Sequence, residues 1–339
     1  MRVTRGLDTS FQAIDRAVVI GSFDGVHIGH QYLIRHTCGE AAARGLEATA
    51  FTFEPVPQEV FSSPSVRGVR LTTEDERLEL LNELCVDHLV VADFNEDFRK
   101  MSAEEFARDI LVAHLHTKLL IAAETHTFGH YAEADVNAIR ALGDNYGFAV
   151  LLLPLLKMDN LRVSSTSVRN YLWEAHAEEA AALLARHYSM RGTVVSGTGT
   201  GRRMGFPTVN LRVAPNKLIP GAAVYAGLAD GHALQQQLGP AAVPCPAAIS
   251  IGPQPTFGRT QLTIEAHIIT DKALDLVGTT LELRLVRRVR LIEQFADAEP
   301  LRSQIANDVE TIQGIFRHGP AETYRTDHAP GPPQGDDES

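Results

Sequence analysis

The sequence predicts two domains of different fold class: a doubly wound α/β domain with a parallel sheet, followed by a small antiparallel β-barrel or sandwich. Up to about residue 187, short apolar runs alternate with helix-length segments, whereas from Arg191 onward short β-rich pieces are separated by Gly and Pro. The length of 339 residues fits two domains of roughly 100 to 200 residues each. We place the first domain at residues 1–187, the second at 188–318, and a tail rich in Pro, Gly and acidic residues, expected to be disordered, at 319–339.

The first domain alternates expected strands with expected helices, as β-α units around a parallel sheet buried on both faces do. The expected strands span residues 17–20, 48–53, 88–92, 119–122 and 148–153. The expected helices span residues 31–44, 73–84, 102–114, 134–146 and 166–187. Ser102 followed by Glu105 has the spacing of a capping box at the start of one of these helices.

The second domain contains short strands at turn-rich intervals, a pattern typical of a barrel or sandwich. The expected strands span residues 193–196, 223–229, 247–251, 262–269 and 279–288. A final helix is expected at residues 297–316, because helical spacing places five apolar side chains on one face: Leu301, Ile305, Val309, Ile312 and Phe316. We expect this face to pack against the barrel.

Composition excludes several classes of protein. The formal net charge of −11 argues against a nucleic-acid-coating protein, which needs a surplus of basic residues to displace counterions. Cys38, Cys85 and Cys245 form no C-x-x-C pair, so we expect neither a disulfide framework nor a zinc knuckle. Residues 1–11 are polar and lack the apolar segment typical of a secretory leader, and no apolar run of about 18 residues occurs. The sequence predicts a cytoplasmic protein, a monomer or weak homo-oligomer, with small-molecule substrates and without nucleic-acid or membrane partners.

The first group of candidate functional residues lies at the first strand-to-helix turn, where His27, Gly29 and His30 precede a helix expected to begin at or just after His30. Ligands of open α/β sheets bind outside the carboxyl ends of the strands, where a helix N-terminus offers N–H groups to phosphate. Two imidazoles there suit nucleotidyl transfer, which needs positioning and charge stabilisation but no protein nucleophile. The simpler interpretation is a pair of structural histidines. Farther on, Ser164 to Arg169 either cap a helix or clamp phosphate in the same crevice.

The second group is a glycine-rich loop followed by polar residues at strand spacing. Glycine occupies alternate positions at 197, 199 and 201, which lets a backbone close around an anion. Thr208 and Asn210 are two residues apart and would face one side of a strand, an arrangement that suits magnesium bound to ATP phosphates. Glu265 alternates with apolar neighbours and is either a solvated strand residue or a base. An ordinary glycine-rich hairpin is the alternative interpretation.

Together, and in this order, the two groups resemble the bacterial bifunctional riboflavin kinase/FMN adenylyltransferase family, also called FAD synthetase, over residues 17–316. The family's G-x-F-D-G-x-H-x-G-H and S-S-T-x-x-R motifs match residues 21–30 and 164–169, and its G-x-G-R-x-x-G-F-P-T-x-N motif matches residues 199–210. The resemblance implies a nucleotidyltransferase-type α/β domain, a riboflavin-kinase barrel with a C-terminal helix, and a set of nucleotide-binding residues: Gly21, Phe23, Asp24, Gly25, Gly29, Ser164, Ser165, Thr166, Arg169, Gly197, Gly199, Gly201, Arg202, Gly205 and Pro207.

The resemblance also implies the chemistry. ATP would phosphorylate riboflavin to FMN in the second domain, and a second ATP would adenylylate FMN to FAD in the first. Glu265 would be the base that activates the ribityl 5′-hydroxyl, and His27 and His30 would be the catalytic residues of adenylylation. Thr208 and Asn210 would coordinate the Mg²⁺ of Mg–ATP. Three side chains would contact the flavin: Phe128, Arg290 and Phe295.

The sequence departs from the family pattern mainly in the first domain. Thr125 and His126 replace the Asp and Phe of a G-x-D-F-x-F-G segment, and Val56 replaces the His of F-x-P-H-P. The changes in the second domain are milder: Ala223 for a glycine and Val277 for a tyrosine. The departures at positions 56, 125 and 126 favour one alternative, an active riboflavin kinase whose first domain has lost FMN adenylylation or uses a different nucleotide or flavin. A non-catalytic flavin- or nucleotide-binding regulator is the other.

Overall fold

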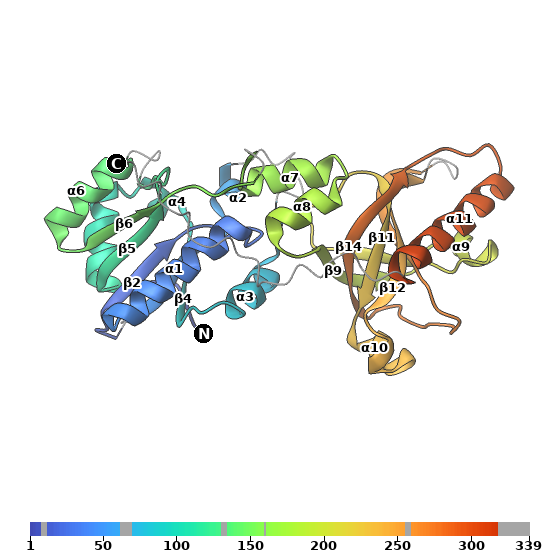
Figure 1. Ribbon diagram of the computed structural model, residues 1–339, viewed down its shortest axis with the longest axis horizontal. Helices are drawn as coiled ribbons and strands as arrows, with labels where there is room; N and C mark the ends of the chain where they lie inside the picture. Colours follow the sequence, from blue (N-terminus) through green and yellow to red (C-terminus); the bar gives the residue numbers. More distant parts are fainter. Residues whose placement is uncertain (8–11, 62–69, 130–133, 159–160, 255–258, 318–339) are drawn as a thin grey trace, which may run out of the picture. The chain divides into compact units, whose positions relative to one another are not determined.

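The computed structural model describes residues 1–7, 12–61, 70–129, 134–158, 161–254 and 259–317 (Figure 1). By its internal contacts the chain divides into two compact units, Met1–Ser165 and the part from Thr166 onward. Each unit is described by itself. The expected disordered tail at 319–339 lies outside the described residues.

The first unit is built on a six-stranded sheet in the order β1-β4-β3-β2-β5-β6, with every pairing parallel. The strands are β1 (Arg2–Arg5), β2 (Arg16–Ile20), β3 (Glu47–Glu54), β4 (His88–Asp93), β5 (Thr117–Ala123) and β6 (Ala149–Leu153). All five expected strands are confirmed. The sequence did not predict the edge strand β1, because it is polar and mostly exposed. The chain runs outward from β2 through β3 and β4 and returns to β5 on the other side of β2, which makes a topological switch point there.

Helices cover both faces of this sheet. They are α1 (Ile28–Arg44), α2 (Pro57–Phe61), α3 (Glu74–Asn82), α4 (Glu96–Lys100), α5 (Ala103–Glu105), which continues as a π-helix over Phe106–His114, and α6 (Val136–Tyr146). Apolar side chains of α1 and α3 pack on one face of the sheet, and those of the π-helix and α6 pack on the other. The doubly wound fold and the capping box of Ser102 and Glu105 are confirmed, whereas α2 and α4 were not expected.

One expectation about cysteine is wrong. Cys38 in α1 and Cys85, just after α3, form a disulfide with their Cα atoms 6.1 Å apart. The two cysteines are 47 residues apart in sequence, and only the packing of α1 and α3 on the same face of the sheet brings them together. Cys245 is free and buried. The disulfide removes one support for the expected cytoplasmic location, because disulfides persist mainly in oxidising compartments.

The second unit is a closed antiparallel barrel in the order β10-β13-β12-β11-β14-β9, which decides between barrel and sandwich. Its strands are β9 (Tyr188–Val195), β10 (Val209–Val213), β11 (Ala223–Asp230), β12 (Cys245–Gln254), β13 (Arg259–Ile268) and β14 (Thr280–Leu291). The five expected strands are confirmed with longer bounds. The short helices α9 (Thr200–Arg203) and α10 (His232–Leu238) and a 3₁₀ turn (Pro240–Ala242) join strands.

Three longer helices accompany the barrel. The expected helical stretch 166–187 is two helices, α7 (Ser165–Trp173) and α8 (Ala177–Leu184). Leu172 in α7 accepts a hydrogen bond from the backbone N–H of Gly221, and α8 contacts β9 and β14, so both helices group with the barrel, while the domain division at residue 187 stays our proposal. The final helix α11 (Ala298–Arg317) packs against β12 and β14. No helix in the described part of the chain is long and apolar enough to cross a membrane.

Candidate functional site

The first candidate site lies at the carboxyl end of β2, beside the switch point. Helix α1 begins at Ile28, earlier than expected, and His27 is its N-cap. The Nδ1 atom of His27 accepts a hydrogen bond from the backbone N–H of His30 at 3.3 Å, and the two imidazole rings stack with centroids 3.7 Å apart. A Cβ on Gly29 would lie 3.1 Å from the His27 ring, so glycine leaves room for that ring. Both histidines therefore stand together at a helix N-terminus, where anions bind favourably.

Hydrogen bonds of the Asp24 side chain stabilise the turn that carries His27. The Asp24 side chain is 1% exposed, and its carboxylate accepts hydrogen bonds from the backbone N–H groups of Leu71 and Thr72 at 3.0 and 3.1 Å. Gly25 has a positive φ of 80°, and its N–H donates to the Thr72 hydroxyl. Phe23 is fully buried and contacts the His30 ring edge-on at 5.3 Å. The structure thus gives Asp24 and Phe23 supporting positions beneath the turn.

Arginine at position 77 also shapes this site, and sequence reasoning missed it. Its guanidinium is almost fully buried and donates to the carbonyl oxygens of Ser22 at 2.8 Å and Phe53 at 3.2 Å. It also pairs with Glu54 at 2.8 Å, and Arg70 binds the other oxygen of the same carboxylate at 2.6 Å. These contacts tie the carboxyl ends of β2 and β3 together. Nothing in the local sequence around Arg77 signals the role, because its partners are backbone groups of distant segments.

Ser165, in the Ser-Ser-Thr segment, contacts the same turn. Its hydroxyl donates to the carbonyl oxygen of Asp24 at 2.9 Å. Thr166 and Arg169 belong to the second unit, and Arg169 is 8% exposed. The expectation that Arg169 reaches the phosphate crevice stays a prediction.

The segment that departs from the family pattern follows β5, the strand beside β2. The Thr125 hydroxyl accepts a hydrogen bond from Arg162 at 3.3 Å. His126 buries its Nε2 atom without a hydrogen-bond partner among the described residues, and this burial lowers the pKa of His126 to about 4, so the ring is neutral at pH 7. Phe128 packs on Phe106 of the π-helix with ring centroids 5.1 Å apart. Val56 is 2% exposed and belongs to the core.

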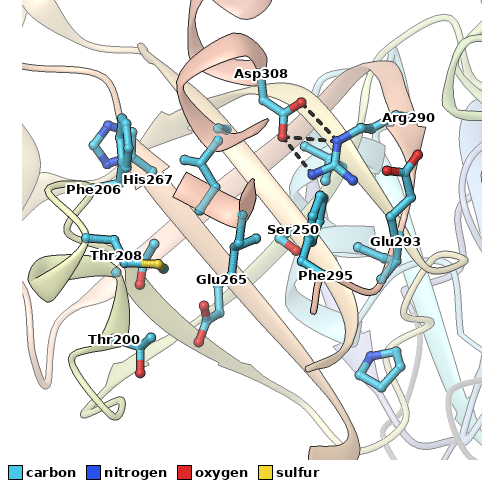
Figure 2. A pocket seen from close by; sticks show the side chains of 18 residues that line it. Thr200, Phe206, Thr208, Ser250, Glu265, His267, Arg290, Glu293, Phe295 and Asp308 are labelled. Atoms are coloured by element: carbon cyan, nitrogen blue, oxygen red, sulfur yellow. Dashed lines mark hydrogen bonds and ion pairs between the residues drawn. The ribbon is translucent and has the colours of Figure 1, made fainter. Parts of the chain in front are cut away.

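The second candidate site is a cavity of about 150 Å³ on the barrel, with walls from the glycine-rich loop, β12, β13, the end of β14 and α11 (Figure 2). On β13, Ile264 and Ala266 are buried inside the barrel, and the Glu265 carboxylate between them faces the cavity. The expected alternation is therefore confirmed. Thr208 lines the same cavity, and Asn210 on β10 pairs in register with Glu265.

The loop requires glycine for two separate reasons, backbone conformation and lack of space for a side chain. Gly199 and Gly205 have positive φ values of 69° and 88°, which disfavour other residues. Gly197 and Gly201 provide room: a Cβ at 197 would collide with the Asn210 amide, and one at 201 would lie 3.0 Å from the Thr208 hydroxyl. The loop is not an open nest throughout, since residues 200–203 form α9, and Arg202 is exposed.

A histidine that sequence reasoning missed holds the end of this loop. His267, two residues after Glu265, lines the cavity, and its Nδ1 lies 2.8 Å from the carbonyl oxygen of Pro207. Because a carbonyl oxygen only accepts, Nδ1 carries the proton and donates it to this bond. The contact anchors the residue that precedes Thr208.

Arg290 and Phe295 form the opposite side of the cavity. The Arg290 guanidinium lies 5.9 Å from the centre of the Phe295 ring and is held by Asp308 of α11 through a contact of 2.9 Å. The structure thus brings four predicted site residues from separate segments into one cavity: Thr208, Glu265, Arg290 and Phe295.

Comparison with known proteins decides the family. Residues 11–167 match the family model of FAD synthetase, and residues 184–316 match that of riboflavin kinase. The bifunctional riboflavin kinase/FMN adenylyltransferase of Escherichia coli (strain K12) is 33% identical over 318 residues, which cover 93% of this chain and 98% of that protein. The chain belongs to the bifunctional riboflavin kinase/FMN adenylyltransferase family.

Other comparisons agree on the extent of the match. The bifunctional riboflavin kinase/FMN adenylyltransferase of Haemophilus influenzae is 30% identical over 320 residues, covering 93% of this chain and 99% of that protein. A crystal structure described as a macrolide-efflux protein from Streptococcus pneumoniae superposes with a TM-score of 0.80 over 92% of this chain and 99% of that chain. At 24% identity that likeness concerns the fold alone.

Proposed function

We propose that this chain makes FAD from riboflavin in two ATP-dependent steps, phosphorylation in the barrel cavity and adenylylation at the turn between β2 and α1. The observation that carries the proposal is the cavity itself, in which the Glu265 carboxylate and Thr208 face a wall that contains Phe295. A carboxylate, an oxygen ligand and an aromatic surface are the groups that phosphorylation of a flavin alcohol needs. The histidine turn supplies the separate anion site of the second step.

In the kinase step, Glu265 would accept the proton of the ribityl 5′-hydroxyl of riboflavin. The hydroxyl oxygen then attacks the γ-phosphorus of ATP, and the bond from that phosphorus to the ADP oxygen breaks, which yields FMN and ADP. The loop that ends at Thr208 would hold the ATP phosphates, and its anchoring by His267 would keep them in line with the attacking oxygen.

Thr208 and Asn210 fit a magnesium ion that is shared with ATP. Their neutral oxygens are the kind of ligand that Mg²⁺ takes in proteins, where nucleotide phosphates complete the coordination. The described residues contain no group of three or more His, Cys, Asp or Glu side chains that would hold a metal without the nucleotide. When bound, the ion would neutralise charge on the transferring phosphoryl group.

In the adenylylation step, a phosphate oxygen of FMN would attack the α-phosphorus of ATP, and pyrophosphate would leave. The positive N-terminal end of α1 and the His27 and His30 imidazoles would stabilise the phosphate charge. Asp24, Gly25 and Ser165 would support the turn. The remaining residues of the first-domain motifs keep the nucleotide-binding roles that the family resemblance implies.

The departures at positions 56, 125 and 126 are compatible with adenylylation. Val56 lies in the core, and Thr125 accepts a hydrogen bond from Arg162, so both side chains have a packing or bonding partner. His126 is neutral because burial lowers its pKa to about 4, and it therefore adds no charge near the site. A cytoplasmic location and a monomeric or weakly self-associating chain without nucleic-acid partners remain proposals, of which the second is tested by light scattering.

Chromatography of reactions with ATP and magnesium tests the proposal, with one reaction starting from riboflavin and a parallel one from FMN. We expect riboflavin to yield FMN and then FAD, and FMN to yield FAD. Accumulation of FMN without FAD from either start would contradict the adenylylation step and support the alternative of a kinase alone. Binding of flavin without any product would contradict both steps.

A further inference from the structure

The end of β14 is tied to the C-terminal helix through an ion pair. Arg290 donates from Nε to both carboxylate oxygens of Asp308 at 2.9 and 3.2 Å, and from Nη2 to one of them at 2.9 Å (Figure 2). Gln304, one turn earlier in α11, donates to the same carboxylate at 2.9 Å. Asp308 is 4% exposed and lines the cavity that contains Glu265.

These contacts use one edge of the guanidinium and leave other donors available. A guanidinium has five N–H groups in a fixed plane. Nε and one N–H of Nη2 engage Asp308, and Nη1 donates to the carbonyl oxygen of Leu291 at 3.1 Å. Among the contacts of the described residues, one N–H on each terminal nitrogen is then left over. With the Phe295 ring 5.9 Å from the guanidinium carbon, the pair presents an aromatic face beside fixed N–H donors.

We propose that Asp308, supported by Gln304, is a positioning residue of the riboflavin kinase: it fixes the Arg290 guanidinium so that its remaining donors meet acceptor atoms of the flavin ring. The inference rests on the proposed kinase function. The α11 helix therefore sets the affinity for flavin as well as covering the barrel.

Two substitutions at position 308 distinguish an effect of the carboxylate's position from an effect of its charge and from a loss of protein stability. In Asp308→Asn the bidentate ionic contact is lost, and we expect the KM for riboflavin to rise about tenfold, as loss of a hydrogen bond to a charged group does, while kcat and the KM for ATP change less than about twofold. Asp308→Glu keeps the charge but moves the carboxylate by one methylene, and we expect it to raise the KM for riboflavin about threefold with an unchanged melting temperature.

A double-mutant cycle shows whether Asp308 acts through Arg290. We expect Arg290→Met and the double variant of Arg290→Met with Asp308→Asn to have the same KM for riboflavin, because residues that act through one contact are not additive. The matched control is Asp230→Asn, which breaks the 3.0 Å pair of Arg284 and Asp230 on the same barrel, outside this cavity. It should leave the KM for riboflavin unchanged.

Three results would overturn the inference: a KM for riboflavin within twofold of wild type in Asp308→Asn, additive effects in the cycle, or the same rise in Asp230→Asn. Should Asp308→Asn fail to fold, Asp308→Glu and Gln304→Met, which removes only the supporting hydrogen bond, carry the same test. If wild-type protein forms no FMN from riboflavin, the proposed kinase function itself fails, and the two failures are thus distinguishable.

Discussion

The substitution Gly201→Ala should damage phosphorylation of riboflavin through one methyl group. Gly201 lies in α9, where alanine is the better helix former by about 1 kcal/mol, so local propensity favours the change. The added Cβ, however, would lie 3.0 Å from the Thr208 hydroxyl oxygen and closer still to the carbonyl oxygen of Phe206, whereas ordinary contacts begin at 3.4 Å. The hydroxyl must therefore retreat by about 0.4 Å, and since a misplacement of about 1 Å costs on the order of 100-fold, we expect kcat/KM for ATP in FMN formation to fall about tenfold.

The assay is FMN formation from riboflavin at varied ATP, followed by chromatography, with conversion of FMN to FAD measured on the same preparation. The control is Gly314→Ala in α11, where a Cβ meets nothing within 4 Å, and it should leave both rates unchanged. FAD formation from FMN should be unaffected by Gly201→Ala. A kinase rate within about twofold of wild type would refute the placement of Thr208 at the ATP phosphates.

Three further predictions concern the first unit. Burial, followed by the neighbouring Arg2 charge, lowers the pKa of His88 from 6.5 to about 4, so the folded form binds a proton less readily than the unfolded chain. The contribution of neutral His88 to the free energy of unfolding is complete above about pH 6.5 and is lost as the pH falls toward 4. Calorimetry at stepped pH should show that the stability of His88→Gln depends less strongly on pH in this range. A variant whose stability depends on pH as strongly as that of wild type would contradict the prediction. Reduction of the bond between Cys38 and Cys85, which closes a loop of 47 residues, should lower the free energy of unfolding of this unit by up to about 4 kcal/mol, while mass spectrometry that finds no linked peptide would exclude the bond. Arg77→Met removes a buried partner of Glu54, which keeps its contact with Arg70, and should destabilise the first unit by about 1.5 to 3 kcal/mol. FAD formation should then be lost at a lower temperature than FMN formation; loss of both activities at one temperature would speak against it.

The sequence predicted the layers of the fold well where each segment carried its own signal. The runs at 17–20 and 88–92 are strands because a strand buried on both faces is apolar along its whole length. The capping box at Ser102 is equally local. The polar edge strand β1 carried no such signal, because only its pairing with β4 makes it a strand.

The candidate site was predictable only in part, because some of its residues act through distant partners. Glu265 stood out through the alternation of its own strand, and the glycines through their spacing. Arg77, His267 and Asp308 bind groups far away in sequence, so no local pattern marks them. Asp308 also lies beside the apolar stripe of α11, where a single carboxylate looks like an ordinary solvent-facing residue.

The disulfide was also not predictable from local sequence. Spacing alone gave no reason to pair Cys38 with Cys85, since neither belongs to a short cysteine motif. Packing of α1 and α3 on one face of the sheet supplied the proximity. Resemblance to the family was likewise needed to select Arg290 and Phe295, whose joint position at the cavity the residues alone did not indicate.

The central claim is that each unit performs one step of FAD synthesis, and crossed variants test it most directly. Glu265→Gln and His30→Asn are assayed by chromatography, singly and mixed, with riboflavin, FMN, ATP and magnesium. We expect Glu265→Gln to convert FMN to FAD but not riboflavin to FMN, and His30→Asn to stop at FMN. The mixture should make FAD from riboflavin. Loss of both steps in either single variant, or of neither, would contradict the assignment of one activity to each site.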